Sequence, residues 1–166
     1  MSRIRRILTV AALLSPVAGA LHAQAPTAPP AGTPSRTRFG AQVSYSFDGE
    51  QVGVGVRLQH SLSKLLGSPQ VDGLAEINWF PETVDVFDLG YNVVYRFRSP
   101  NLKPYAGGGV VLLIASGSGQ SDSDLNLNAM GGLEFKPLGR IAPFVQLRYV
   151  FAGQGDGLIM TGGFFF

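Results

Sequence analysis

Hydrophobic and polar side chains alternate with a period of two from Arg38 onward. In residues 38–47 every odd position is apolar or aromatic and every even position is polar or glycine. In residues 52–60 the pattern recurs, with Val52, Val54 and Val56 on the apolar side. A helix would scatter such residues around its circumference, whereas a strand sends them to opposite faces. The pattern therefore predicts β-strands with one apolar face.

Eight segments either carry this alternation or are assigned as strands by their position and spacing along the chain. They are residues 38–47, 52–60, 71–80, 87–98, 105–115, 125–136, 143–151 and 158–166. The segments 105–115 and 158–166 are apolar or small on both sides, so the pattern does not assign their faces. About 9–11 residues suffice for a tilted strand to cross a bilayer, and eight is the smallest strand number usual for such barrels. We predict an all-β fold, an eight-stranded antiparallel up-and-down transmembrane β-barrel.

Two features favour lipid outside the barrel and polar groups inside. The polar face carries small residues such as Gly53, Gly55 and Gly90, as a narrow eight-stranded lumen requires. The apolar face carries aromatic residues toward strand ends, among them Trp79 and Phe151, as in the girdles at membrane interfaces. A soluble lipocalin-like barrel with a hydrophobic ligand alternates as well, with its apolar face inward, and it remains the alternative fold.

Composition excludes several classes of function. The chain has no cysteine, which excludes disulfides, thiol catalysis and cysteine zinc sites. Its charged fraction is 14%, well below the roughly 25% usual for soluble domains. The net charge of +2 becomes −1 without Arg3, Arg5 and Arg6, which lie in a segment expected to be removed. We therefore expect no nucleic-acid partner.

The first 36 residues precede the alternating region. A basic start, an apolar run over residues 7–14 and Ala23 before Gln24 are typical of a secretory signal peptide, predicted here as residues 1–23. Residues 24–36 are rich in Pro and Ala and are predicted to be a disordered linker. The barrel is predicted to span residues 37–166. Export into a cell envelope of the Gram-negative type and location in the outer membrane follow from these assignments.

The chain resembles the small outer-membrane β-barrel domains of the OmpA and OmpX kind. The resemblance rests on the signal peptide, the alternating strands, the segment KPYAGGG at residues 103–109 and the aromatic end of the chain. It implies that Met160, Phe164 and Phe166 form a signal read by the barrel-assembly machinery. It also implies lipid and lipopolysaccharide as surroundings, and we expect a monomer.

The charged residues on the inward face are the main candidate site. An unpaired charge in a narrow interior costs about 3–5 kcal/mol, so we predict that Glu76 and Glu134 pair with arginines. Asp88 lies nearer the outer end. An internal brace and a gated pore for small solutes are both compatible with such pairs. The predicted lumen network consists of Arg57, Glu76, Arg96, Glu134 and Arg148.

Acidic residues gather in the loops expected to face outward, where no Lys or Arg occurs. The turns expected in the periplasm, 61–70, 99–103 and 137–142, carry Lys and Arg instead. One hypothesis is that the outer acids bind divalent cations that bridge lipopolysaccharide phosphates; the alternative is solvated loop tips. The acidic outer-loop residues are Asp48, Glu50, Glu82, Asp85, Asp122, Asp124 and Asp156.

No catalytic constellation stands out. His60 and Ser61 are adjacent, but neighbouring strand residues point to opposite faces and no acidic partner is recognisable. We therefore expect no enzyme, no catalytic residue, no metal and no cofactor, with a lipid-modifying outer-membrane enzyme as a distant alternative. The expected function is a structural or surface-interaction role in the cell envelope, and the nearer alternative is the narrow gated pore.

Overall fold

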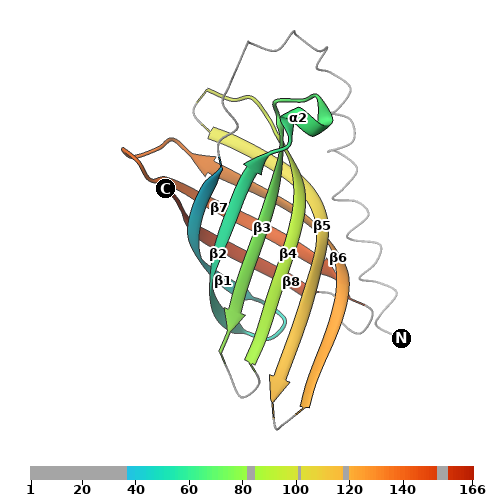
Figure 1. The fold of residues 1–166 in the computed structure, drawn as a ribbon. Helices are drawn as coiled ribbons and strands as arrows, with labels where there is room; N and C mark the ends of the chain where they lie inside the picture. Colours follow the sequence, from blue (N-terminus) through green and yellow to red (C-terminus); the bar gives the residue numbers. More distant parts are fainter. Residues whose placement is uncertain (1–36, 82–84, 101, 118–119, 153–156) are drawn as a thin grey trace, which may run out of the picture. The chain divides into compact units, whose positions relative to one another are not determined.

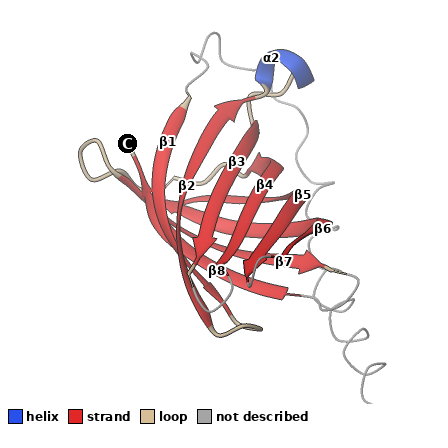
Figure 2. Cartoon of the chain, turned by 60° about the horizontal axis from the view of Figure 1, so that its bottom comes forward, coloured by secondary structure: helices blue, strands red, loops and turns tan. Residues whose placement is uncertain are grey.

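Eight antiparallel strands form one closed barrel (Figures 1 and 2). The computed structural model describes residues 37–81, 85–100, 102–117, 120–152 and 157–166. Each strand pairs with its neighbour in the sequence, and β8 pairs with β1 to close the ring. The strands are β1 (Arg38–Ser46), β2 (Gln51–Ser61), β3 (Val71–Phe80), β4 (Asp85–Arg96), β5 (Leu102–Gly117), β6 (Gln120–Phe135), β7 (Ala142–Phe151) and β8 (Gly157–Phe165).

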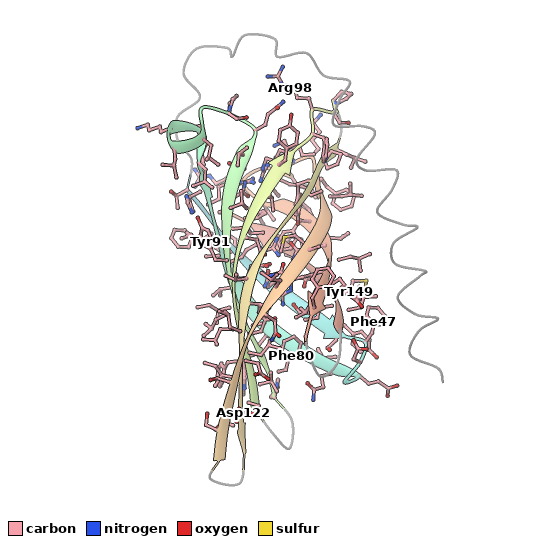
Figure 3. The ribbon with its side chains drawn as sticks, turned by 90° about the vertical axis from the view of Figure 1, so that its right-hand side faces the viewer. Phe47, Phe80, Tyr91, Arg98, Asp122 and Tyr149 are labelled. Atoms are coloured by element: carbon pink, nitrogen blue, oxygen red, sulfur yellow. The ribbon has the colours of Figure 1, made fainter. Side chains whose placement is uncertain are left out.

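The predicted fold class is confirmed, and one predicted loop is wrong. The sequence pattern ends one strand at residue 115, begins the next at residue 125 and thus places residues 116–124 in an outer loop. In the structure β5 continues to Gly117 and β6 begins at Gln120, and these two residues pair. Asp122 and Asp124 therefore lie within β6, opposite Ala115 and Leu113, and not in a loop. The Ser-Asp alternation reads as a loop in sequence, yet a hairpin that satisfies its own backbone hydrogen bonds tolerates polar side chains on both faces. Figure 1 shows this hairpin reaching past its neighbours, and Figure 3 labels Asp122 near its tip.

The two ends of the barrel differ in what they carry. We call the end where β1 begins and β8 finishes the terminal end, and the opposite end the distal end. The terminal end holds the one helix of the described residues, α2 (Ser63–Leu66), in the predicted turn 61–70. Gly67 follows α2 with a φ of 67°, in the left-handed region that glycine adopts without strain. No helix among the described residues is long and apolar enough to span a bilayer.

The apolar rows lie outside the barrel and the charged rows inside. Val52, Val54 and Val56 are each at least half exposed on the outer wall, whereas Arg57 and Arg148 are at most 2% exposed. A water-soluble barrel with an apolar interior is the reverse of this arrangement. The soluble lipocalin-like alternative is therefore wrong, and the fold is that of a transmembrane barrel.

The structure also assigns the faces of the two strands that the sequence pattern did not resolve. In β5, Tyr105 and Val111 point inward and are buried, while Val110 is exposed on the outer wall. In β8, Ile159 and Phe165 are buried in the lumen. The predicted assembly residues Met160, Phe164 and Phe166 all lie on the outer wall.

Small residues inside the barrel lie beside large ones. A Cβ on Gly132 would collide with the ring of Tyr105, and a Cβ on Gly163 would lie 2.7 Å from the ring of Phe144. These glycines leave the space that the inward rings occupy. The excess of small residues on the polar face is therefore a packing requirement of the narrow lumen.

Candidate functional site in the barrel lumen

The lumen is filled in layers, and β3 carries one residue of each. Asp72 belongs to a charged group near the terminal end, and Leu74 belongs to an apolar layer. Glu76 lies in a second charged group, and Phe80 belongs to an apolar group near the distal end. Inward side chains recur at every second residue of a strand, so the order of these residues along β3 is also their order along the lumen.

We name the two charged groups by their residues. The terminal cluster consists of Arg38, Gln59, Asp72, Arg96, Lys103 and Glu134. The central cluster consists of Arg57, Glu76, Asp88 and Arg148.

Glu76 joins the two arginines of the central cluster. Its Oε1 accepts a hydrogen bond from Arg57 Nη2, and its Oε2 lies 3.6 Å from Arg148 Nη1. Arg148 also pairs with Asp88 through its Nη2. All four side chains are at most 2% exposed. Two arginines thus face two carboxylates in a buried interior, where each charge depends on its partners.

Amides and a ring complete the coordination of Arg57. Its Nε donates to Gln42 Oε1 at 2.6 Å, and its Nη2 donates to Gln146 Oε1 at 3.0 Å. Gln146 Nε2 in turn donates to Glu76 Oε1 at 3.2 Å. The guanidinium carbon lies 3.8 Å from the centre of the Phe144 ring, a cation–π contact. These contacts form one connected network inside the lumen at this height.

Glu134 is the centre of the terminal cluster. It accepts hydrogen bonds from Arg38 at 2.6 and 2.9 Å, from Arg96 at 3.1 Å and from Lys103 at 3.3 Å. The carboxylate is fully buried, but the side chain of Arg38 is 21% exposed and that of Lys103 is 48% exposed. Two cations of this cluster therefore remain in partial contact with water, whereas all four side chains of the central cluster are buried.

A second carboxylate ties the terminal cluster together. Asp72 Oδ2 lies 2.5 Å from Arg96 Nε and accepts a hydrogen bond from Gln59 Nε2 at 2.5 Å. Gln59 Oε1 accepts from Arg38 Nη2 at 2.7 Å. The chain of contacts runs from β4 through β3 and β2 to β1, so it braces four neighbouring strands from within.

The structure places all five predicted lumen residues inside the barrel, in two groups. Arg57, Glu76 and Arg148 meet in the central cluster, while Arg96 and Glu134 meet in the terminal cluster. Sequence reasoning missed the pairing roles of Arg38, Asp72 and Asp88. Their positions on the polar face of the alternation were the available signal.

The described acidic residues of the distal end do not converge. Asp48 and Glu50 lie in the β1–β2 turn, and Asp85 begins β4, where its Oδ1 accepts a hydrogen bond from Trp79 Nε1 at 3.1 Å. No group of three or more candidate metal ligands occurs among the described residues. Asp122 and Asp124 lie in β6, as described above. Glu82, Asp156 and the predicted signal peptide and linker, residues 1–36, lie outside the described residues.

His60 and Ser61 do not face one another. On the outer wall, His60 Nε2 lies 3.0 Å from the hydroxyl of Tyr91. Figure 3 labels Tyr91. Ser61 Oγ donates to Ser63 Oγ at 3.0 Å. The two residues thus have separate partners on separate faces of β2.

Comparisons with known proteins find similar proteins by structure alone. No protein-family model and no curated protein matches the chain by sequence. The N-terminal β-barrel domain of Pseudomonas aeruginosa OprF matches with a TM-score of 0.60 and 16% identity, over 78% of this chain and 96% of that one. Neisserial surface protein A matches with a TM-score of 0.52 and 16% identity, over 78% and 91% of the two chains.

A third similar structure is an enzyme. The outer membrane enzyme PagL matches with a TM-score of 0.51 and 15% identity, over 78% of this chain and 97% of that one. At such identities the likeness concerns the fold and not the chemistry, since one fold carries many functions. The resemblance inferred from the sequence is confirmed at the level of the fold. This chain is a small eight-stranded transmembrane barrel and shares that fold with these outer-membrane proteins.

Proposed function

We propose that the chain is an integral outer-membrane protein with a structural or surface-interaction role in the cell envelope. The observation that carries the proposal is the central cluster, whose four charged side chains are at most 2% exposed and fill the middle of the lumen. A barrel closed in this way anchors a protein and presents its turns, but it does not conduct. Neisserial surface protein A, a surface protein by name, is a structural neighbour with a similar fold.

Conductance in planar bilayers tests this role. We expect the refolded full barrel to give no stable single-channel steps, because the central cluster closes the lumen. Frequent, uniform openings of the wild-type protein would overturn the closed-barrel role. A heat-treated, unfolded sample provides the control for detergent artefacts.

A narrow gated pore is the second candidate, and one observation favours it. The lumen is closed by ion pairs and amides, and Arg148 Nε has no hydrogen bond among the described residues. A guanidinium with a spare donor can change partners more readily than a packed aliphatic plug can move. The variants Glu76→Gln and Arg148→Gln separate the two candidates. Newly appearing openings at unchanged thermal stability support gating, whereas destabilisation without openings supports a brace.

The outer-membrane location completes the proposal and includes residues 1–23 as a cleaved signal peptide. Support comes from the exposed apolar wall and from the fold shared with outer-membrane proteins. We expect the protein in the outer-membrane fraction of an expressing Gram-negative cell, with a mature N-terminus at Gln24. Recovery of the folded protein in the soluble fraction would contradict the outer-membrane location. A mature protein that still begins at Met1 would contradict the cleaved signal peptide.

The partners in the proposal are lipid, lipopolysaccharide and the barrel-assembly machinery, with the barrel itself a monomer. Met160, Phe164 and Phe166 lie in a row on the outer wall, as an externally read signal requires. We expect Phe166→Ser to slow assembly in cells while leaving the stability of the refolded barrel nearly unchanged. Equal assembly of the variant and wild type would remove the signal role.

We assign no catalytic role to His60 and Ser61. The separate partners of the two side chains support this assignment, since nucleophile and base need mutual hydrogen-bond reach. Release of fatty acid from lipopolysaccharide by the wild type, lost in His60→Ala, would contradict it.

A further inference from the structure

Two turns at the terminal end expose leucines more fully than the outer wall does. Leu65 in α2 is 78% exposed, and Leu138 in the turn between β6 and β7 is 75% exposed. These are the highest values among the large apolar side chains of the described residues. Each leucine has an exposed apolar companion, Leu66 in α2 and Ile141 in the other turn. Such side chains gain free energy where an apolar medium covers them.

A cation accompanies each of these apolar pairs. Lys64 directly precedes Leu65, and Arg140 lies in the other turn. Both cations are exposed, and the side chain of neither has an ion-pair or hydrogen-bond partner among the described residues. The two turns, residues 62–70 and 136–141, contain no Asp or Glu. Their charge is therefore complementary to an anionic surface.

Hydrogen-bonded backbone presents both apolar pairs. Leu138 N donates to Ile141 O at 2.8 Å, and Ile141 N donates to Leu138 O at 3.3 Å, so the two residues face each other across a tight hairpin. Gly139 makes this turn with a φ of 67°, in the left-handed region. In α2, Leu65 N donates to Leu62 O at 3.0 Å. The exposed side chains thus project from regular turns.

The two turns lie on opposite sides of the same end of the barrel. One joins β2 to β3 and the other joins β6 to β7, so four strands separate them in either direction around the closed ring. Figure 1 labels α2 at this end. In an antiparallel ring both turns follow even-numbered strands, which run in one direction. A single leaflet of a bilayer can therefore contact both.

We propose that the two turns bind the headgroup layer of an anionic phospholipid leaflet. Leu65 and Leu138 insert at the level where the acyl chains begin, and Lys64 and Arg140 pair with the lipid phosphates. The membrane interface suits this combination, because apolar groups enter hydrocarbon there while cations stay among headgroups. Cations at this level favour anionic over zwitterionic lipid. The inference rests on the proposed lipid surroundings and adds the headgroup that the terminal end selects.

Methyl NMR in lipid nanodiscs tests the depth of the turns. The full chain is placed, one barrel per disc, in a mixture of phosphatidylcholine and phosphatidylglycerol, and an aqueous gadolinium chelate relaxes the methyl groups that water reaches. We expect the methyl groups of Leu65 and Leu138 to be relaxed as little as those of Val54 and Val56 on the outer wall.

The possible failures of this experiment are distinguishable. Strong relaxation of the leucines with protected valines would place the turns in water and overturn the inference alone. Strong relaxation of Val54 and Val56 as well would contradict the membrane position of the whole barrel and hence the proposed function. Protection of the leucines only in discs that hold two barrels would assign the surface to a second copy of the chain and overturn the lipid site.

Electron spin resonance of spin-labelled lipids tests the headgroup. We expect phosphatidylglycerol to associate with the barrel about two- to threefold more strongly than phosphatidylcholine. A cation favours an anionic headgroup about fivefold at its own site, and most sites around the barrel lack a cation. Equal association of the two lipids with the wild type would overturn the anionic preference.

A pair of double variants assigns the preference to the two turns. Lys64→Gln with Arg140→Gln removes both charges and should lower the preference by about half, because other cations at this end remain. Lys64→Arg with Arg140→Lys keeps the charges and should behave as the wild type does. Both side chains are exposed and without partners, so we expect each variant to fold. An unchanged preference in the glutamine variant would remove the two turns as the site.

Discussion

The central and terminal clusters contain the same kinds of side chain but differ in their access to water. Glu76 and its two arginines are sealed from solvent, whereas Glu134 is held by Arg38 and Lys103, whose side chains reach water. Water can replace a lost partner in the terminal cluster but not in the central one. The contribution of these ion pairs to stability depends on how deeply the partners are buried and not on how many pairs a cluster contains.

The largest expected effect is that of Glu76→Gln. The substitution removes the charge that Arg57 and Arg148 share, and it leaves a buried positive charge without compensation. We expect a loss of about 3–5 kcal/mol in the free energy of unfolding. Urea titration in micelles, followed by fluorescence of Trp79, measures it. Glu50→Gln in the exposed distal turn is the control, with an expected change within about 0.5 kcal/mol. A similar loss in both variants would erase the distinction that burial makes.

Overpacking between the clusters comes next. Gly132→Val would press on the ring of Tyr105 and on the carbonyl oxygen of Val145. The Tyr105 hydroxyl donates to Gln146 Oε1 at 3.0 Å. We expect a loss of about 1–3 kcal/mol in the same titration. Gly162 has no neighbour within 4 Å of an added Cβ, so Gly162→Val should be nearly neutral. Equal losses in the two glycine variants would mean that strand propensity, and not the inward ring, sets the requirement.

Glu134→Gln should cost less than Glu76→Gln. Arg38, Arg96 and Lys103 lose a carboxylate, but their exposed atoms regain hydration. We expect a loss of about 1–2 kcal/mol, because the pairs lie between exposed and buried types. A loss as large as that of Glu76→Gln would show that water does not reach the terminal cluster in the folded barrel.

Ionic strength gives the smallest and most selective effect. The Debye length falls from about 10 Å at 0.1 M salt to about 3 Å at 1 M, and buried pairs are screened least. We expect the loss measured for Glu134→Gln to shrink by about half over this range, while that for Glu76→Gln stays constant. Parallel urea titrations at the two salt concentrations provide the test. Salt dependence of the Glu76→Gln loss would place water in the centre of the lumen.

Alternation, the spacing of the segments, and the small and aromatic residues on their two faces together were sufficient to predict eight strands and the lipid-facing side of six of them. A period of two determines on which face a residue lies, and a closed antiparallel ring follows from eight such segments joined by turns. Val94, which interrupts the alternation of its strand in sequence, is 2% exposed and packs with Leu74 in the apolar layer of the lumen. Val94 is therefore an apolar residue on the otherwise polar inner face because it packs in the layer between the two clusters.

The sequence predicted that Glu76 and Glu134 pair with arginines, which the structure confirms, but it could not predict which arginine meets which carboxylate. Arg38 and Glu134 are 96 residues apart and meet only because β8 closes on β1 and the strands are staggered. The height of a residue along the lumen depends on register and tilt, which alternation does not specify. The predicted strands of the β5–β6 hairpin were also too short, for a different reason. The side chains of residues 121–124 are polar on both faces, so no alternation marks their strand.

The central claim is that the aliphatic and aromatic rows meet lipid while the charges lie within. Trp79, the single tryptophan, reports on it directly. Its ring is 41% exposed on the outer wall and stacks beside Phe87, with its Nε1 donating to Asp85. In bilayers with bromine atoms near the head-group end of the acyl chains, the account predicts strong quenching of Trp79 and little quenching by aqueous iodide. Strong iodide quenching without bromolipid quenching would contradict it.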